Sequence, residues 1–151
     1  MKAIIKTFVQ TSEDTANSLN SLFLRVPAGI IFAAHGAQKL FGWFGGYGLA
    51  GTGGWMESIG LSPGYLMALA AGSAEFFGGL LLLLGLLTRP VAAVLAFTML
   101  IAIVSVHLPH GLFISNNGYE FGLALLAISL AVLAGGAGRF SVDHWLAKKL
   151  A

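Results

Sequence analysis

The sequence predicts an all-α fold: a four-transmembrane-helix bundle, antiparallel, with short interfacial helices in the outer loop and in the C-terminal tail. Hydrophobic residues make up 57% of the 151 residues and charged residues only 9%. The mean hydropathy of +0.86 lies well above that of soluble domains. In addition, four apolar segments are each long enough to cross a bilayer, which takes roughly 20 helical residues.

The four predicted spans cover residues 21–41, 64–87, 90–108 and 118–136. The first span is expected to be retained as a true span, because about 20 mostly polar residues precede it, unlike the short start of a cleaved signal peptide. The predicted domains are a cytoplasmic N-terminal segment at 1–20, a membrane domain at 21–136 and a cytoplasmic interfacial tail at 137–151.

Proline-containing turn signals mark the boundaries of the spans. Ser62-Pro63 precedes the second span as a cap followed by proline at the first helical position. Thr88-Arg89-Pro90 separates the second span tightly from the third, which predicts an antiparallel pair. Leu108-Pro109 ends the third span, because the residue before a proline avoids the helical region.

The distribution of lysine and arginine predicts the orientation. Lys39 alone falls on one side of the predicted membrane, and the other seven basic residues fall on the side of both termini: Lys2, Lys6, Arg25, Arg89, Arg139, Lys148 and Lys149. Both termini are therefore predicted to be cytoplasmic, with loops 42–63 and 109–117 facing outward. Thr52 is expected to open the interfacial helix of the longer loop, and Ser141 to cap that of the tail.

Composition and motifs also exclude several functions. The chain has no cysteine, so it has no disulfide, no thiol redox centre and no thiolate ligand for an iron–sulfur cluster. Its basic residues form no run, which argues against a nucleic-acid partner. The glycine-rich loop follows no strand and lacks the GxGxxG and GxxxxGK[ST] spacings, which argues against nucleotide binding.

Glu75 occupies an unusual position in the second span. On a helical wheel it shares a face with Ala68, Ala71, Gly72, Gly78, Gly79 and Leu82, opposite Leu66, Leu69, Phe77, Leu80, Leu81 and Leu84. Small residues are typical of a helix-packing face in membranes, and bulky ones of a lipid-facing one. Glu75 is therefore expected to face neighbouring helices near mid-membrane, where a carboxyl group is costly and commonly functional.

Other polar residues are expected near the outer ends of the spans. His35, Gln38 and Lys39 share one face of the first span, whereas His107 ends the third span and Glu120 begins the fourth. An outward-opening pocket is therefore predicted, with Glu75, His35 and Lys39 as candidate catalytic residues and Gln38, His107 and Glu120 as candidate substrate-binding residues.

Three of these residues have ordinary structural interpretations that the sequence leaves open. Lys39 is suited to snorkel at the C-terminus of a helix, which favours cations. Glu120 lies three residues after Asn117 and is suited to the N3 position of a capping box. His107 is suited to cap the C-terminus of the third span.

The remaining residues have structural interpretations as well. His35 is suited to be a core histidine bonded to a carbonyl group, and Glu75 to be a structural partner of His35 or Lys39. Arg25 is interpreted as an anchor at the inner membrane interface. A metal site built from His107-x-x-His110 with His35 and Glu75 ranks last, because Pro109 breaks the helical spacing, and no metal is predicted.

The order of the motifs resembles the DoxX family of small bacterial membrane proteins. The motifs are Arg25, HGAQKLFG at 35–42, GYGLAGTGGWMESIGLSP at 46–63, AEFFGGLLLLLGLLTRP at 74–90, NGYEFGLALLAISLAVL at 117–133 and GRFSVD at 138–143. The resemblance implies a four-helix integral membrane protein, often labelled an oxidoreductase or a subunit related to thiosulfate:quinone oxidoreductase. Four residues match positions carried over as candidate functional residues: His35, Lys39, Glu75 and Glu120.

Two function classes follow. A redox role requires a bound quinone or a redox partner subunit, because the chain shows no cofactor motif of its own and no covalent cofactor is expected. In that class, His35, Lys39 and Glu75 would hydrogen-bond the quinone carbonyls and manage its protons. The alternative is a non-enzymatic membrane partner, a scaffold or a small-molecule permeation protein. In both function classes the protein is expected to lie in the lipid bilayer, and both classes are compatible with a homo-oligomer.

Overall fold

The fold is entirely helical over the part of the chain that the computed structural model describes, residues 15–150. The helices are α2 (Thr15–Phe41), η1 (Trp43–Gly45), α3 (Gly48–Ser58), α4 (Gly64–Leu84), α5 (Thr88–Ala102), η2 (Ile103–His107), η3 (Leu108–His110), η4 (Ile114–Asn116), α6 (Glu120–Gly135) and α7 (Val142–Leu150). The all-α prediction is confirmed for these residues. Most of the predicted 1–20 segment, with Lys2 and Lys6, lies outside them.

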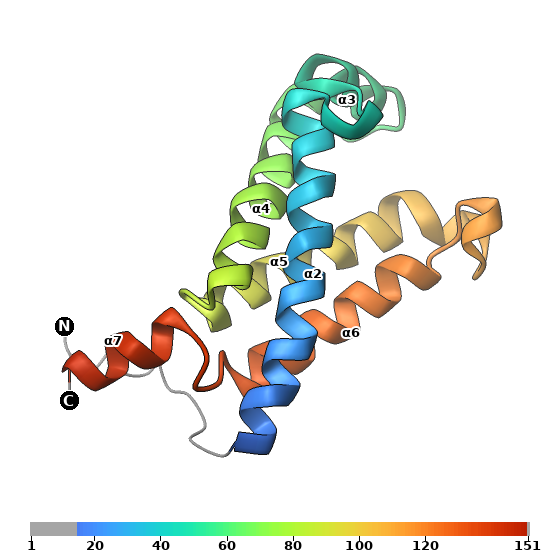
Figure 1. The fold of residues 1–151 in the computed structure, drawn as a ribbon. Coiled ribbons are helices and arrows are strands. Elements are labelled where there is room, and N and C mark those ends of the chain that lie inside the picture. The colour runs from blue at the N-terminus through green and yellow to red at the C-terminus, as the bar shows by residue number, and fades with distance from the viewer. Residues whose placement is uncertain (1–14, 151) are drawn as a thin grey trace.

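Helices α2 and α4 lie side by side and form the α2–α4 pair (Figure 1). Glycines bring their backbones together. A Cβ atom added at Gly36 would overlap the backbone nitrogen of Phe76, and one added at Gly29 would lie 2.8 Å from the carbonyl oxygen of Gly79. Because these contacts involve backbone atoms, a larger residue at either glycine would push the two helices apart.

The faces of α4 follow the prediction from its sequence. Its buried residues are Gly64, Ala68, Gly72, Glu75, Gly78, Gly79 and Leu82. Its exposed large side chains include Leu66, Leu69, Phe77, Leu80 and Leu84. The small-residue face therefore packs against other helices, and the burial predicted for Glu75 is confirmed.

Helices α5 and α6 form a second pair, the α5–α6 pair, which meets the α2–α4 pair and then diverges from it toward loop 111–119 (Figure 1). The buried core where the pairs meet comprises Ala28, Phe32, Leu82, Val91, Ala92, Leu95, Met99, Leu125 and Val132. The four long helices thus do not run as one bundle along their whole length. We call the ends of the two pairs at loops 42–63 and 111–119 the outer ends, and the end that carries α7 the inner end.

The connection between α4 and α5 differs from the prediction. The turn lies at Gly85–Leu87, where Gly85 and Leu87 adopt positive φ angles of 65° and 49°. Thr88-Arg89-Pro90 forms the first turn of α5 instead of a separator. Proline is tolerated there because the first N–H groups of a helix have no partner within that helix.

The longer outer loop contains the predicted short helix, but α3 begins at Gly48 and not at Thr52, which is buried within it. Glu57 connects α3 to the start of α4. Its carboxylate accepts a hydrogen bond from the Ser62 hydroxyl at 2.6 Å and another from the backbone N–H of Gly64. The loop is therefore fixed against the first turn of α4.

Membrane-spanning capacity differs among the helices. Residues 64–84 and 88–110 form two helical stretches that are long and apolar enough to cross a bilayer. Helix α6 is apolar but has 16 residues, or about 24 Å at 1.5 Å per residue, against a hydrocarbon core of about 30 Å. Helix α2 has 27 residues but includes Arg25, His35 and Lys39. The four-span topology stays a prediction.

Candidate functional site

An ion pair joins α2 and α4 near their outer ends. The Lys39 Nζ atom lies 2.5 Å from Glu75 Oε2, and the two side chains are 25% and 4% exposed. The Glu75 carboxylate is therefore buried with a cation beside it, as a carboxylate removed from water requires. We call this ion pair the outer centre.

Two glycines allow this contact, one from α2 and one from α4. Gly36, in the H-G-x-x-K element, removes the side chain that would hold α4 away from α2. Gly72 lies one turn before Glu75, and a Cβ atom there would lie 2.8 Å from the Leu40 side chain and 3.2 Å from Lys39 Cβ. The stem of Lys39 thus lies along the backbone of α4, which directs its ammonium group to the carboxylate.

His35 lies one helical turn before Lys39, at the place where the two helix pairs meet. Its ring packs against Phe121 of α6, with centroids 5.9 Å apart and planes tilted by 49°. The residue as a whole is exposed. The positive charge of Lys39 also acts on the ring electrostatically. His35 therefore adds a titratable group beside the outer centre.

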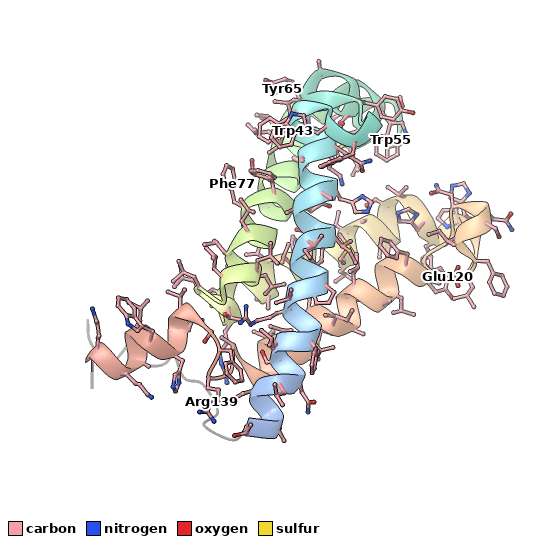
Figure 2. All side chains as sticks on the ribbon, in the orientation of Figure 1. Trp43, Trp55, Tyr65, Phe77, Glu120 and Arg139 are labelled. Carbon is pink, nitrogen blue, oxygen red and sulfur yellow. The ribbon has the colours of Figure 1, made fainter. Side chains whose placement is uncertain are left out.

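The other three predicted site residues bind their own loops. Gln38 Nε2 donates to the Phe44 carbonyl oxygen at 3.3 Å, and His107 Nδ1 lies 2.8 Å from the Asn117 carbonyl oxygen. Figure 2 shows Glu120 on the α5–α6 pair, far from the α3 end of the molecule. Because the pairs diverge, the structure does not bring His107 and Glu120 to Lys39 and Glu75.

The predicted capping box at Glu120 is wrong. The N-cap of α6 is Tyr119, and Glu120 is the first helical residue. Asn117 has a positive φ of 62° and ends the preceding 3₁₀ turn, so it does not occupy the N-cap position. The Glu120 carboxylate instead accepts a hydrogen bond from the Ile114 backbone N–H at 2.6 Å and closes the outer loop on itself.

No group of three or more His, Cys, Asp or Glu side chains among residues 15–150 is placed to hold a metal ion. The alternative that combined His107-x-x-His110 with His35 and Glu75 fails geometrically. His107 and His110 lie in η2 and η3 at the end of the α5–α6 pair, whereas Glu75 is paired with Lys39 inside the other helix pair.

A second polar centre, around Arg25 at the inner end, was missed by the interpretation of Arg25 as an interface anchor. Arg25 is only 2% exposed. Its guanidinium donates hydrogen bonds to the carbonyl oxygens of Leu82, Leu83, Ala137 and Phe140. Arg25 therefore caps the C-terminus of α4 and holds the segment after α6 against it. We call this the inner centre.

The GRFSVD segment supplies the rest of the inner centre. Asp143, 1% exposed, accepts hydrogen bonds from the backbone N–H groups of Leu87 at 2.8 Å and Thr88 at 2.9 Å, and so caps α5. Ser141 accepts one from the His144 N–H at 3.2 Å, which confirms its predicted role as a cap. Because backbone N–H groups bond both oxygens of Asp143, the motif carries no local signal for the burial of Arg25.

Comparison with known proteins identifies the family. Residues 21–108, more than half of the chain, match the family model described as DoxX. This chain belongs to the DoxX family. The protein named "Putative oxidoreductase CatD" of Bacillus subtilis is 38% identical over 114 residues, which cover 76% of this chain and 78% of that protein. No solved structure matches the chain significantly.

A second relative bears on the location of the chain. "Inner membrane protein YqjF" of Escherichia coli is 38% identical over 134 residues, which cover 85% of this chain and 92% of that protein. Together with the family, this relative supports a membrane location for the chain. The matched range 21–108 includes Lys39 and Glu75, so both partners of the outer centre lie within the part of the chain that matches the family model.

Proposed function

We propose that this DoxX-family protein is an inner-membrane component of a quinone-linked oxidoreductase and that its outer centre handles the quinone's protons. The observation that carries the proposal is the ion pair between Lys39 and a 4% exposed Glu75, with an exposed His35 one turn away. Titratable groups buried inside membrane helices commonly mark proton or substrate pathways.

The chemistry of quinone reduction matches these groups. A quinone takes up two electrons and two protons to become a quinol, and one proton is bound at each carbonyl oxygen. The Lys39 ammonium would hydrogen-bond one carbonyl oxygen, and Glu75 and His35 would each take up a proton from water and pass it to a carbonyl oxygen. The electrons must come from a redox partner subunit, because the chain has no cysteine and its sequence carries no flavin or nucleotide fingerprint.

The outer centre retains capacity for such a ligand. Lys39 makes one hydrogen bond within the described residues, to Glu75, and an ammonium group has three N–H donors. Its side chain is a quarter exposed, so the remaining donors are accessible. The relative named "Putative oxidoreductase CatD" is consistent with a redox role.

One observation favours the alternative class, a non-enzymatic membrane partner or scaffold. Lys39 and Glu75 satisfy each other's charge at the close glycine-mediated contact between α2 and α4. In this alternative the ion pair only fixes the two helices. The two functions differ in what they predict for a variant that loses the charge of Glu75.

The decisive experiment measures quinone content and thermal stability together. Wild-type protein and Glu75→Gln are extracted in mild detergent, and bound quinone is quantified by mass spectrometry. Glu75→Gln is expected to remain folded, because the amide keeps the shape, and to lose its quinone, because a neutral amide no longer fixes the Lys39 ammonium group that binds the carbonyl oxygen. Glu120→Gln is the matched control: it makes the same change outside the outer centre and should retain quinone.

The structural alternative predicts a different result. Removing the Glu75 charge alone would leave the Lys39 cation without its buried partner, at a cost of about 3 to 5 kcal/mol. The Lys39→Gln/Glu75→Gln double variant would recover most of that stability. A strongly destabilised single variant with unchanged quinone, or wild-type protein without quinone, would contradict the redox proposal.

The membrane arrangement is part of the proposal and needs its own test. We propose that α2, α4, α5 and α6 each span the bilayer, with both termini and Arg89 cytoplasmic. Reporter fusions at Arg89 and Ala151 should then read as cytoplasmic, and a fusion at Gly54 in α3 as external. An external reading at Ala151 would place the outer centre in the opposite half of the membrane.

A further inference from the structure

An open cavity of about 690 Å³ lies at the inner end, between the first turns of α2, the start of α5 and the last turns of α6. Its polar lining comes from Asn17, Asn20, Ser21 and Arg89, and its apolar lining includes Leu24 and Val132. This volume falls within the range of small-molecule binding sites. None of these residues belongs to the outer centre.

Arg89 is the unusual member of the lining. Its Nε atom is buried without a hydrogen-bond partner, and no hydrogen bond or ion pair joins its guanidinium to another residue in the described range 15–150. Nearby carbonyl groups already have donors: Ser21 donates to the Gly136 carbonyl oxygen at 2.6 Å, and Arg25 donates to that of Ala137. Arg89 is thus left as a half-buried cation without an acceptor.

We propose that this cavity binds a phosphate-bearing anion, held by the guanidinium of Arg89 and the side-chain amide of Asn20. The planar donor fork of arginine matches phosphate oxygens two at a time. Arg89 is also the second residue of α5. The first N–H groups of that helix are already bonded to Asp143, so the guanidinium supplies the positive charge of the site. The mixed lining suits a headgroup beside an apolar chain.

Two sources can supply that chemistry. One is the headgroup of an anionic phospholipid in the leaflet at the inner end, where the predicted cytoplasmic charges also gather. The other is a water-soluble phosphate. Both place a phosphate on Arg89, and they are distinguished by whether the bound molecule partitions into the membrane.

The test uses the full chain in detergent micelles, with binding followed by thermal unfolding and by native mass spectrometry. The probes are phosphatidylglycerol, dioleoylglycerol as a lipid without phosphate, and inorganic phosphate. Arg89→Gln is expected to weaken phosphate-dependent binding about tenfold, as expected for loss of a charge-assisted contact. Arg139→Gln is the matched control, because Arg139 is an exposed residue of the inner end that bonds to Thr15 and does not line the cavity.

Two further variants keep the test decisive if Arg89→Gln folds poorly. Arg89→Lys keeps the charge but loses the donor fork, so it should bind more weakly than wild type. Asn20→Asp places a carboxylate in the cavity and should repel the anion to a similar extent as the loss of Arg89. Stabilisation by phosphatidylglycerol but not by dioleoylglycerol supports a lipid source, and stabilisation by inorganic phosphate alone supports a soluble one.

Three outcomes would overturn the proposal. The first is equal binding by wild type and Arg89→Gln, and the second is the absence of any phosphate-dependent binding by wild type. The third concerns Glu13 and Asp14, which lie outside the described residues. In that outcome the Glu13→Gln/Asp14→Asn variant loses as much stability as Arg89→Gln, the two losses do not add in the combined variant, and no phosphate binds. The chain itself then supplies the anion for Arg89.

Discussion

Helix α2 carries two basic side chains that pack against other segments, Arg25 near its middle and Lys39 in its last turn, and the surroundings of the two differ. Arg25 is 2% exposed and donates hydrogen bonds to four backbone carbonyl oxygens. Lys39 has a side chain 25% exposed and bonds to one carboxylate, that of Glu75. A guanidinium whose donors are nearly all used joins segments of the fold, whereas an ammonium group with donors to spare can still bind a ligand.

The two centres also differ in their carboxylates. Asp143 is buried, and both of its oxygens accept hydrogen bonds from the first N–H groups of α5. Glu75 is equally buried but is bonded to a side chain. Both oxygens of the capping carboxylate are bonded to backbone groups, whereas Glu75 is bonded through Oε2 to one side chain, that of Lys39. The inner centre is therefore suited to a structural role, and the proposed function places the chemistry at the outer centre.

The largest expected effect is the loss of the Arg25 guanidinium. Arg25→Met removes the side-chain donor from four backbone carbonyl oxygens, of which that of Leu82 still accepts from the Gly85 N–H. It also leaves Asp143 without the cation that acts on it, so we expect a cost of about 3 to 5 kcal/mol. The stability of Arg25→Lys should lie between those of wild type and Arg25→Met, because lysine keeps the charge but lacks the planar donor fork of arginine. Unfolding in detergent measures the stability of both variants. If Lys39→Met lowers stability as much as Arg25→Met, the comparison between the centres fails.

The next effect tests the contact that forms the outer centre. Gly36→Ala would place a methyl group on the backbone of Phe76, and overpacking of this kind costs about 1 to 3 kcal/mol. Gly54→Ala in α3 is the matched control, because nothing lies within 4 Å of its added Cβ and alanine favours a helix. Thermal unfolding should give a lower melting temperature for Gly36→Ala than for Gly54→Ala. Equal melting temperatures would show that α2 and α4 tolerate separation.

A smaller effect is expected at the inner cap. Asp143→Ala removes both acceptors from the first turn of α5, and loss of an N-terminal cap costs about 0.5 to 2 kcal/mol. Asp143→Asn keeps one acceptor and should retain part of this stability. Denaturant unfolding in mixed micelles measures the difference. An unchanged midpoint for Asp143→Ala would remove Asp143 from the inner centre.

The sequence predicted those features that depend on local periodicity. The wheel of α4 placed Glu75 among small residues, and its burial and its contact with a basic residue of α2 follow from that face. The cap formed by Ser141 also needed only a local pattern. These predictions required no knowledge of how the helix pairs cross.

Features that depend on the crossing of helices could not be predicted this way. His107 and Glu120 were expected beside Lys39 because all lie near outer ends, but the divergence of the pairs separates them. Arg25 was interpreted as an anchor because the segment that covers it, at 137–143, is more than 110 residues away in the chain. Composition carries no signal for such long-range burial.

The smallest expected effect concerns Glu57, the exposed counterpart of Asp143 at the outer end. The Ser62 hydroxyl and the Gly64 N–H stabilise its charged form and lower the pKa of Glu57 below its ordinary value of 4.5. Because the folded pKa is the lower one, this stabilisation is present above pH 4.5 and is lost as the pH falls through the folded pKa. Melting temperatures of wild type and Glu57→Gln should therefore differ at neutral pH and converge on acidification. Ser62→Ala should show part of the same convergence, because it removes the largest cause of the shift. A difference that persists unchanged at acidic pH would mean that the side chain of Glu57 acts through packing and not through its charge.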